Sequence, residues 1–264
     1  MKESLLATWC YRGFVISSIR TELRAKFTRS KLGGLWMILH PLSQVLIFAF
    51  VFSSLLSAKL PGIASPHAYA IYLLAGTLAW ALFTEIVNRC LTLFIDNAPL
   101  LRKVSFPKIT LPLIAMGGAL VHNAFLFAAT LFVFGLLGHV PGAAILWLPV
   151  LMGVTVALAF GLGVILGVLN VFMRDIGQVV PVALQFCFWL TPIVYVESII
   201  PPQYRGWLVL NPLAPVVKGY QNILLYNRPP EWGGLGVTLV VTLVLFAVSL
   251  VLFRKASPDM VDQL

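Results

Sequence analysis

The sequence contains apolar stretches that are long enough to cross a lipid bilayer. Residues 109–173 include no lysine, arginine, aspartate or glutamate. A helix needs about 20 mostly apolar residues to cross the roughly 30 Å hydrocarbon core of a membrane. Across the chain 60% of residues are hydrophobic and 10% are charged, against about 45–50% and about 25% in soluble domains. A soluble fold cannot bury that much apolar surface, so the sequence predicts an all-α, polytopic membrane protein.

Six stretches meet this length requirement, and turns rich in glycine, proline or charge separate them. The predicted spans are residues 35–56, 69–93, 109–137, 143–170, 176–195 and 235–253. Residues 199–232 contain several prolines and only short apolar pieces, which predicts short helices in the outer interface or re-entrant into it. Gly161, Gly163 and Gly167 recur at intervals that permit close packing of the fourth span. One membrane domain covering residues 1–264 is expected.

The segment before the first span, residues 9–28, is basic and has an apolar stripe at helical spacing. Ile16, Ile19 and Leu23 fall on one face, and Glu22 falls mostly on the opposite, polar face. This pattern predicts an amphipathic helix in the inner interface, with arginines that reach the lipid headgroups. A basic cytoplasmic tail with accidental periodicity is the alternative. The apolar stretch 14–19 lacks a small-residue cleavage site, so no cleavable signal peptide is expected.

Basic residues predict the orientation of the chain in the membrane, because loops rich in lysine and arginine stay in the cytoplasm. Arg102, Lys103 and Lys108 lie together between the second and third predicted spans. Of the 18 lysines and arginines, the ones expected outside are Lys59, Arg205, Lys218 and Arg228. Both termini are therefore predicted to face the cytoplasm.

Charged residues also interrupt or border the predicted spans. Glu85 and Arg89 lie four residues apart near the inner end of the second span. A charge in mid-span costs on the order of 2.5–3.5 kcal/mol for insertion, so such groups are usually paired. We expect a mutual ion pair here, with a role in gating as the alternative. Arg174 and Asp175 mark a cytoplasmic turn between the fourth and fifth spans.

Motifs for chemistry are missing from the sequence. It has no His-Glu-x-x-His, no Gly-x-Ser-x-Gly and no Gly-x-x-x-x-Gly-Lys phosphate loop. Cys10, Cys90 and Cys187 lie far apart and do not have metal-ligand spacing. The sequence therefore predicts no metal and no cofactor. Its basic residues are concentrated in short segments beside apolar runs, which is the pattern of membrane topology, so no binding of nucleic acid is expected. If the protein drives transport, another polypeptide supplies the energy.

Several blocks resemble, in the same order, the permeases of ABC-2 type polysaccharide exporters. The first block is residues 24–36, Arg-Ala-Lys-Phe-Thr-Arg-Ser-Lys-Leu-Gly-Gly-Leu-Trp, followed by His-Pro-Leu at 40–42. The others are Gly76 with Trp80 and Phe83, Asn97 with Pro-Leu-Leu-Arg-Lys at 99–103, Phe-Pro at 106–107, Leu-Pro at 111–112, Phe-Met-Arg-Asp-Ile at 172–176, Trp-Leu-Thr-Pro-Ile-Val-Tyr at 189–195 and Asn-Pro at 211–212. This ordered set covers nearly the whole chain and is most similar to O-antigen and related lipopolysaccharide exporters.

The resemblance implies a transport subunit and not an enzyme. Two copies of such a permease assemble with two copies of a P-loop ATPase, which holds ATP and Mg²⁺. Together they pass an undecaprenyl-diphosphate-linked polysaccharide across the bacterial cytoplasmic (inner) membrane, surrounded by membrane lipids. The permease itself carries no cofactor. The resemblance leaves teichoic acid and capsular polysaccharide open as alternative substrates.

The resemblance also assigns roles to segments of this chain. Residues 97–104 would form a coupling helix that docks in the ATPase, through Asn97, Pro99, Leu100, Leu101, Arg102, Lys103 and Val104. Residues 9–28 would act as a gate at the inner interface, where the candidates are Trp9, Arg20, Arg24, Phe27 and Arg29. Candidates to line an aromatic conduit are Trp36, Phe48, Phe52, Phe186 and Trp189. Ordinary anchoring at the membrane interface is the alternative for these aromatics.

Two other classes of protein compete with an exporter. An integral membrane glycosyltransferase or acyltransferase would need a cluster of polar catalytic residues at one membrane face. It would also turn over its substrate without a partner. An ion channel would need a polar filter, and the sequence has none.

Overall fold

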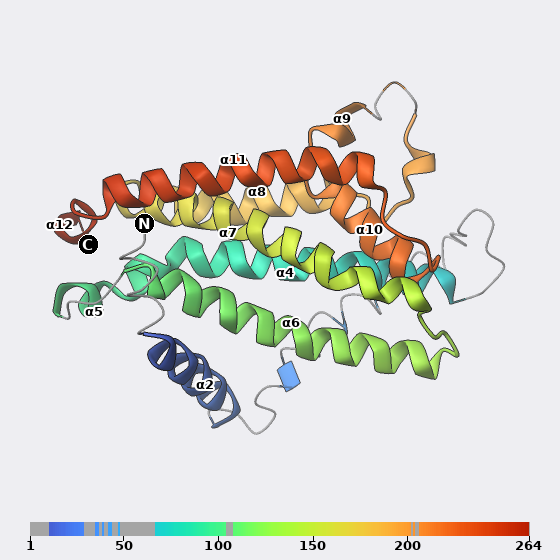
Figure 1. Cartoon of the computed structure of the whole chain (residues 1–264), viewed down its shortest axis with the longest axis horizontal. Helices are drawn as coiled ribbons and strands as arrows, with labels where there is room; N and C mark the ends of the chain where they lie inside the picture. Colours follow the sequence, from blue (N-terminus) through green and yellow to red (C-terminus); the bar gives the residue numbers. More distant parts are fainter. Residues whose placement is uncertain are drawn as a thin grey trace.

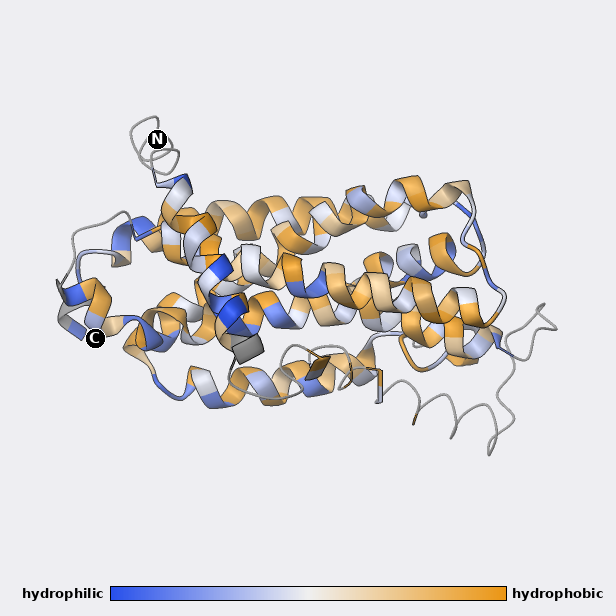
Figure 2. Ribbon diagram, turned by 90° about the horizontal axis from the view of Figure 1, so that it is seen from below, coloured by the Kyte–Doolittle hydropathy of each residue, from blue (hydrophilic) through white to orange (hydrophobic). Residues whose placement is uncertain are grey.

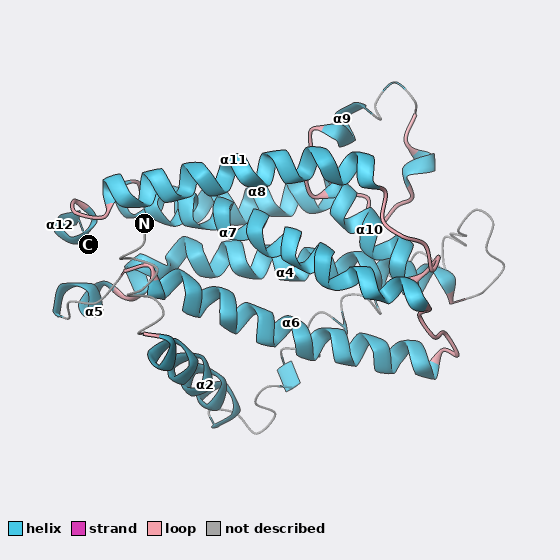
Figure 3. Ribbon diagram, in the orientation of Figure 1, coloured by secondary structure: helices cyan, strands magenta, loops and turns pink. Residues whose placement is uncertain are grey.

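The computed structural model describes residues 11–28, 67–103, 108–201 and 206–263, with isolated positions at 35, 36, 39, 42, 43, 47 and 203. Every regular element in these residues is a helix (Figure 3), which confirms the all-α prediction. The longer helices are α2 (Arg12–Thr28), α4 (Ala68–Asp96), α6 (Thr110–Leu136), α7 (Leu148–Phe172), α8 (Ile176–Leu190) and α11 (Trp232–Ala256). The shorter helices are α5 (Ala98–Lys103), η3 (Ala143–Trp147), η4 (Glu197–Ile199), α9 (Gly206–Val209), α10 (Ala214–Leu224) and α12 (Met260–Gln263).

Four helices in the described part of the chain are long and apolar enough to cross a membrane. They are α4, α6, α7 together with η3, and α11. They correspond to the second, third, fourth and sixth predicted spans. The first predicted span, 35–56, lies outside the described residues except for isolated positions, so it remains a prediction. The structure thus supports four of the six predicted spans by length and composition.

The fifth predicted span, residues 176–195, was too long. α8 ends at Leu190 and has 15 residues, which rise about 22 Å and fall short of the roughly 30 Å hydrocarbon core. The reason is the Thr-Pro pair that follows. A residue before proline is disfavoured in the helical conformation, and Thr191 is extended, with φ −94° and ψ 135°.

The segment after α8 leaves the helical conformation while it is still buried. Its carbonyl groups find donors on α4: the Tyr69 hydroxyl donates to the carbonyl of Val194, and the Tyr72 hydroxyl lies 3.1 Å from the carbonyl oxygen of Pro192 and 3.0 Å from that of Tyr195. The side-chain amide of Gln221 also donates to the Pro192 carbonyl at 3.0 Å. These bonds satisfy the polar backbone groups, which is the condition for irregular structure at membrane depth.

α4 is the central helix of the bundle (Figure 1). It packs against α6 on one side and α7 on the other, and α10 contacts the same helix. α6 and α7 follow each other in the sequence but pack mainly on α4, and α7 packs in addition on α11. Most of α4 is buried, whereas α6 and α11 keep long apolar faces exposed. Figure 2 shows this apolar surface along the bundle, with hydrophilic residues on α2 and near the bundle ends.

Small residues allow the close contact between α4 and α7. A Cβ atom at Gly167 would lie 2.2 Å from the carbonyl oxygen of Cys90, and one at Gly163 would lie 2.9 Å from the Cβ of Cys90. A Cβ at Gly161 would lie 3.0 Å from the backbone nitrogen of Phe246 in α11. The predicted packing role of these three glycines is confirmed.

The long helices alternate in direction, so the connections gather at two ends of the bundle (Figure 1). The end that carries α5 and α12 is called the α5 end, and the end that carries α9 and α10 is called the α10 end. The basic loop after α4 and the residues after α11 therefore share one end. The described residues of the proline-rich region 199–232 lie at the α10 end. This agrees with the prediction that the region and the basic loop lie on opposite sides of the membrane.

Candidate functional site

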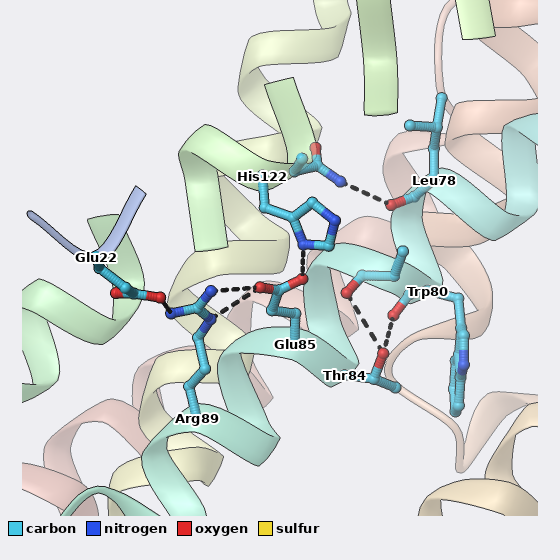
Figure 4. Close-up of polar contacts among 9 residues, drawn as sticks. Glu22, Leu78, Trp80, Thr84, Glu85, Arg89 and His122 are labelled. Atoms are coloured by element: carbon cyan, nitrogen blue, oxygen red, sulfur yellow. Dashed lines mark hydrogen bonds and ion pairs between the residues drawn. The ribbon is translucent and has the colours of Figure 1, made fainter. Parts of the chain in front are cut away.

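Four ionisable side chains from three helices meet inside the described bundle (Figure 4). The Arg89 guanidinium of α4 lies at their centre, with its Nη1 2.6 Å from Glu22 Oε1 of α2. Its Nε and Nη2 each lie 2.8 Å from Oε1 of Glu85, one turn earlier on α4. The second oxygen of Glu85 contacts Nδ1 of His122 on α6. We call these four residues the charged cluster.

The charged cluster lies well inside the apolar length of α4. At 1.5 Å per residue, Arg89 is about 10 Å and Glu85 about 16 Å from the end of the helix at Asp96. The four side chains are only 19–33% exposed. Ionised groups at such depth are costly unless they are paired, so the mutual pairing explains how these helices tolerate them. The structure contains the expected pair of Glu85 with Arg89 and extends it to two further helices.

Glu22 lies on the opposite face of α2 from the one that the sequence predicted. Its side chain faces the bundle next to the partly buried Ile19 and Leu23, while Ile16 of the predicted apolar stripe is 64% exposed. The ion pair with Arg89 determines which face of α2 packs on the bundle. A hydropathy pattern does not reveal this, because it contains no information on a charged partner in another helix. The available signal was that Glu22 is the single acidic residue in an otherwise basic helix.

Two adjacent glycines in α6 make room for this approach of α2. A Cβ atom at Gly117 would lie 2.4 Å from Cδ1 of Ile19. A Cβ atom at Gly118 would lie 2.9 Å from Nη1 of Arg89 and 3.1 Å from Oε2 of Glu22. A side chain at either position would have to displace the outer atoms of Ile19, or of Arg89 and Glu22.

Residues 97–104, predicted to dock in an ATPase, include the short helix α5. Asn97 joins α5 directly to α4: its side-chain amide donates to the Leu93 carbonyl at 2.8 Å, and its own carbonyl accepts from the Leu101 amide at 3.0 Å. Pro99 and Arg102 are exposed. Val104 and the side chain of Lys103 lie outside the described residues.

The predicted docking patch of Leu100 and Leu101 is divided by the structure. Leu101 is only 8% exposed and belongs to the hydrophobic core, whereas Leu100 is partly exposed. The sequence interpretation treated them as one surface, but neighbours in a helix point about 100° apart. Leu101 therefore holds α5 on the bundle, and Pro99, Leu100 and Arg102 remain accessible.

α12 packs against α5 and α7 and was not expected from the sequence. Its Met260 is 1% exposed, and Lys108 donates from Nζ to the backbone carbonyl of Ser257 just before this helix. The helix is too short for a hydrophobic period to be visible in the sequence. Its contacts with α5 and α7 therefore connect α5 to the bundle.

We expect substitution of Met260 by alanine to loosen α5, because removal of a fully buried methionine costs roughly 2–5 kcal/mol. In hydrogen–deuterium exchange, the amides of 98–103 should exchange at least about tenfold faster. Gln263→Ala, at an exposed position in α12, is the matched control and should leave these rates unchanged. Equal exchange in the two variants would show that α12 does not support α5.

The remaining predicted gate and conduit residues are scattered or outside the described part. Arg20 and Arg24 are exposed on α2, and Trp36, Phe186 and Trp189 are exposed as well. Trp9, Arg29, Phe48 and Phe52, and the side chain of Phe27, lie outside the described residues. Arg174 and Asp175 are both exposed at the turn before α8, and the described residues show no ion pair between them. Phe186 and Trp189 lie three residues apart on α8, and both side chains are largely exposed on the single chain.

A second ion-pair group lies at the α10 end. Nζ of Lys218 in α10 lies 3.0 Å from Oε2 of Glu197 in η4 and 3.0 Å from Oε2 of Glu231 at the start of α11. Partial burial would lower the pKa of Lys218, but the two carboxylates outweigh that effect and the pKa is raised. Lys218 therefore joins η4, α10 and the start of α11. The sequence interpretation had counted it only as an outer positive charge.

The chemistry of these groups is that of pairing and not of catalysis. Among the described residues, no three histidine, cysteine, aspartate or glutamate side chains are arranged to hold a metal ion. Arg89 and Lys218 each bind two carboxylates, so the acidic residues around them are already engaged. The fold and these sites define a multi-pass membrane protein with internally neutralised charges.

Comparison with known proteins identifies the family. The family model described as "ABC-2 type transporter" matches residues 15–225, and the chain belongs to this family. It is therefore a multi-pass transport subunit that lacks a nucleotide-binding domain, pairs with an ABC ATPase that binds ATP, and carries no cofactor. This excludes the membrane transferase considered from the sequence.

Curated relatives cover nearly the full chain at low identity. The O-antigen export system permease protein RfbA of Klebsiella pneumoniae is 27% identical over 89% of this chain and 88% of its own length. The protein of that name from Myxococcus xanthus is 27% identical over 96% of both chains. The polysialic acid transport protein KpsM of Escherichia coli is 27% identical over 90% of this chain and 92% of its own.

Proposed function

We propose that this chain is the permease of an ATP-driven exporter for an undecaprenyl-diphosphate-linked polysaccharide of O-antigen type. The observation that carries the proposal is similarity along almost the whole chain to permeases named for O-antigen export. The comparable coverage by a relative named for polysialic acid transport makes a capsular polysaccharide the second candidate.

The proposed assembly contains two copies of this chain and two ATPase subunits in the bacterial cytoplasmic membrane. Basic residues support a cytoplasmic location for the α5 end, because Arg102, Arg254 and Lys255 gather there. Both termini would then lie in the cytoplasm. The exposed Phe186 and Trp189 of α8 would meet the second copy and border the path of the polymer.

In this proposal α5 receives the force of ATP binding and α4 transmits it. Only Asn97 separates the two helices, so a displacement of α5 moves the end of α4. The charged cluster ties α4 to α2 through Arg89 and Glu22. α2 would therefore follow α4 and act as the gate at the inner interface, where the exposed Arg20 and Arg24 would reach the lipid headgroups.

Depletion of this chain in its source bacterium tests the proposed function. Lipid-linked polymer is expected to accumulate on the cytoplasmic side and to disappear from the cell surface. The polymer that accumulates, O-antigen or capsule, distinguishes the two candidates. Unchanged surface polymer, with no lipid-linked polymer retained inside, would contradict the proposal.

Charge reversal at α5 tests the proposed docking surface. Arg102→Glu combined with Lys103→Glu should weaken retention of the ATPase during purification by at least about tenfold, or roughly 1.4 kcal/mol, because rim charges set the complementarity of an interface. Arg174→Glu, an exposed arginine at the same end of the bundle, is the matched control and should retain the ATPase. Full retention by the double variant would rule out docking through α5.

A further inference from the structure

A cavity of about 220 Å³ lies at the α10 end, beside the segment that follows α8. Its wall is built from the beginning of α4, the end of α10 and the residues just after each of α8 and α10. The side chains used in the argument below are Tyr72, Glu197, Gln221, Asn222, Tyr226 and Arg228. The cavity therefore lies far along the bundle from the charged cluster and α5.

Part of this wall is fixed by hydrogen bonds within the chain. The Tyr72 hydroxyl donates to backbone carbonyls of the segment after α8, and the Gln221 amide nitrogen donates to one of the same carbonyls. Both side chains are buried. They hold the shape of the cavity and are not free to bind a ligand with those groups.

Other polar groups of the wall are available. The side-chain amide of Asn222 and the guanidinium of Arg228 make no hydrogen bond with the described residues, and both side chains reach solvent. Tyr226 is half-buried beside them, and the charge of Arg228 acts on its phenol. An amide and a guanidinium are planar groups with several donors or acceptors. Such groups suit the neighbouring hydroxyls of a sugar, while a tyrosine ring can cover its apolar face.

The charges around the cavity balance. Lys218 is neutralised by Glu197 and Glu231 at 3.0 Å each, which leaves one negative charge in that group. Arg228 contributes one positive charge at the same cavity. An anionic ligand, such as a phosphate headgroup or an acidic sugar, would find no excess positive charge here. The balance favours a neutral ligand that is rich in hydroxyl groups.

We propose that this cavity binds one neutral sugar residue of the exported polymer at the outer end of the permease. The volume fits a single ring and not a longer segment, since sites for larger ligands measure about 300–1,000 Å³. The proposal rests on the proposed function, because polysaccharide is its source of sugar. Asn222, Tyr226 and Arg228 make the contacts, and the Tyr72 and Gln221 side chains keep the wall in place.

Saturation-transfer NMR tests this site on the complete complex with its ATPase in lipid nanodiscs. The probes are the methyl glycosides of glucose, galactose and mannose, the methyl glycoside of glucuronic acid, and glycerol 1-phosphate as a headgroup mimic. At least one neutral glycoside should receive saturation. Asn222→Ala should reduce its transfer about fivefold, the effect of one lost hydrogen bond, and Arg228→Gln should reduce it as well. Gln178→Ala, an exposed amide on α8 at the opposite end, should match the wild type.

The outcomes separate this inference from the proposed function. Saturation of glycerol 1-phosphate or of the glucuronide alone, or an unchanged signal in Asn222→Ala, would overturn the sugar site. ATP-dependent export of polymer is measured on the same complex reconstituted into sealed proteoliposomes. Export by the wild type without transfer to any neutral glycoside would refute the site and leave the exporter standing, whereas the lack of export would count against the exporter itself.

Discussion

Substitution of Arg89 by methionine is expected to destabilise the protein by about 3 kcal/mol and to abolish most export. Removal of one partner from a buried ion pair typically costs about 3–5 kcal/mol, because the other charge remains unpaired in a poor solvent. Here two carboxylates, Glu22 and Glu85, would lose their shared cation, while the contact of Glu85 with His122 would remain. The side chains are partly exposed, so the lower end of the range applies. Thermal unfolding of the purified protein measures the loss.

A neutral version of the charged cluster separates its two roles. Glu22→Gln and Glu85→Gln added to Arg89→Met remove the unpaired charges and should recover most of the stability. If Arg89 and Glu22 tie α2 to α4 during transport, export should stay low in this triple variant. Arg89→Lys keeps the charge but loses the forked geometry, so an intermediate result is expected. Wild-type stability in Arg89→Met would show that the observed pairing contributes nothing.

Substitution of Gly167 by alanine is the second change with a large expected effect, about 3 kcal/mol or more of lost stability. The new Cβ would lie 2.2 Å from the carbonyl oxygen of Cys90. Both groups belong to helix backbones, so no flexible side chain can move aside, and overpacking of this kind exceeds the usual cost of about 1–3 kcal/mol. The contact between α4 and α7, which forms the centre of the bundle, would have to open. Unfolding of purified protein in increasing sodium dodecyl sulfate measures the change.

Gly153 provides the control in the same helix. A Cβ atom there would have no neighbour within 4 Å, so Gly153→Ala should be neutral or more stable by up to about 1 kcal/mol, as expected from helix propensity. The same substitution in the same helix thus has opposite expected signs at two positions. Equal effects at both positions would disprove the close contact of α4 with α7.

Hydropathy predicted the helices but not their arrangement. The ends of α4, α6, α7 and α11 follow from where apolar runs stop at charge, proline or glycine. The order in which the helices pack does not follow from the sequence, because the third and fourth spans are consecutive and would be expected to pack on each other. Instead α4 lies between them, and Gly163 and Gly167 fit its backbone. The helix that each glycine contacts depends on how the helix surfaces fit together in three dimensions, and the hydropathy pattern does not contain this information.

Polar contacts between distant segments were the main omission at the candidate sites. Glu85 and Arg89 could be paired from the sequence because they are one helical turn apart. Glu22 and His122 lie 67 and 37 residues from their partners in the charged cluster, and Lys218 is 21 residues from Glu197, so none of these contacts follows from helical spacing. Leu101 was misjudged for a local reason, since adjacent leucines in a helix face different surroundings.

Tyr69 and Tyr72 at the start of α4 connect this helix to the segment after α8. At one end it continues through Asn97 into α5, and at the other its Tyr69 and Tyr72 hydroxyls hold the backbone that follows α8. A slide of α4 by one residue, about 1.5 Å, would lengthen or break those hydrogen bonds. α4 would thus transmit a displacement along its axis between α5 at one end and the segment after α8 at the other. A displacement of α5 at one membrane face would therefore reach the opposite face through a single helix, with no loop in between.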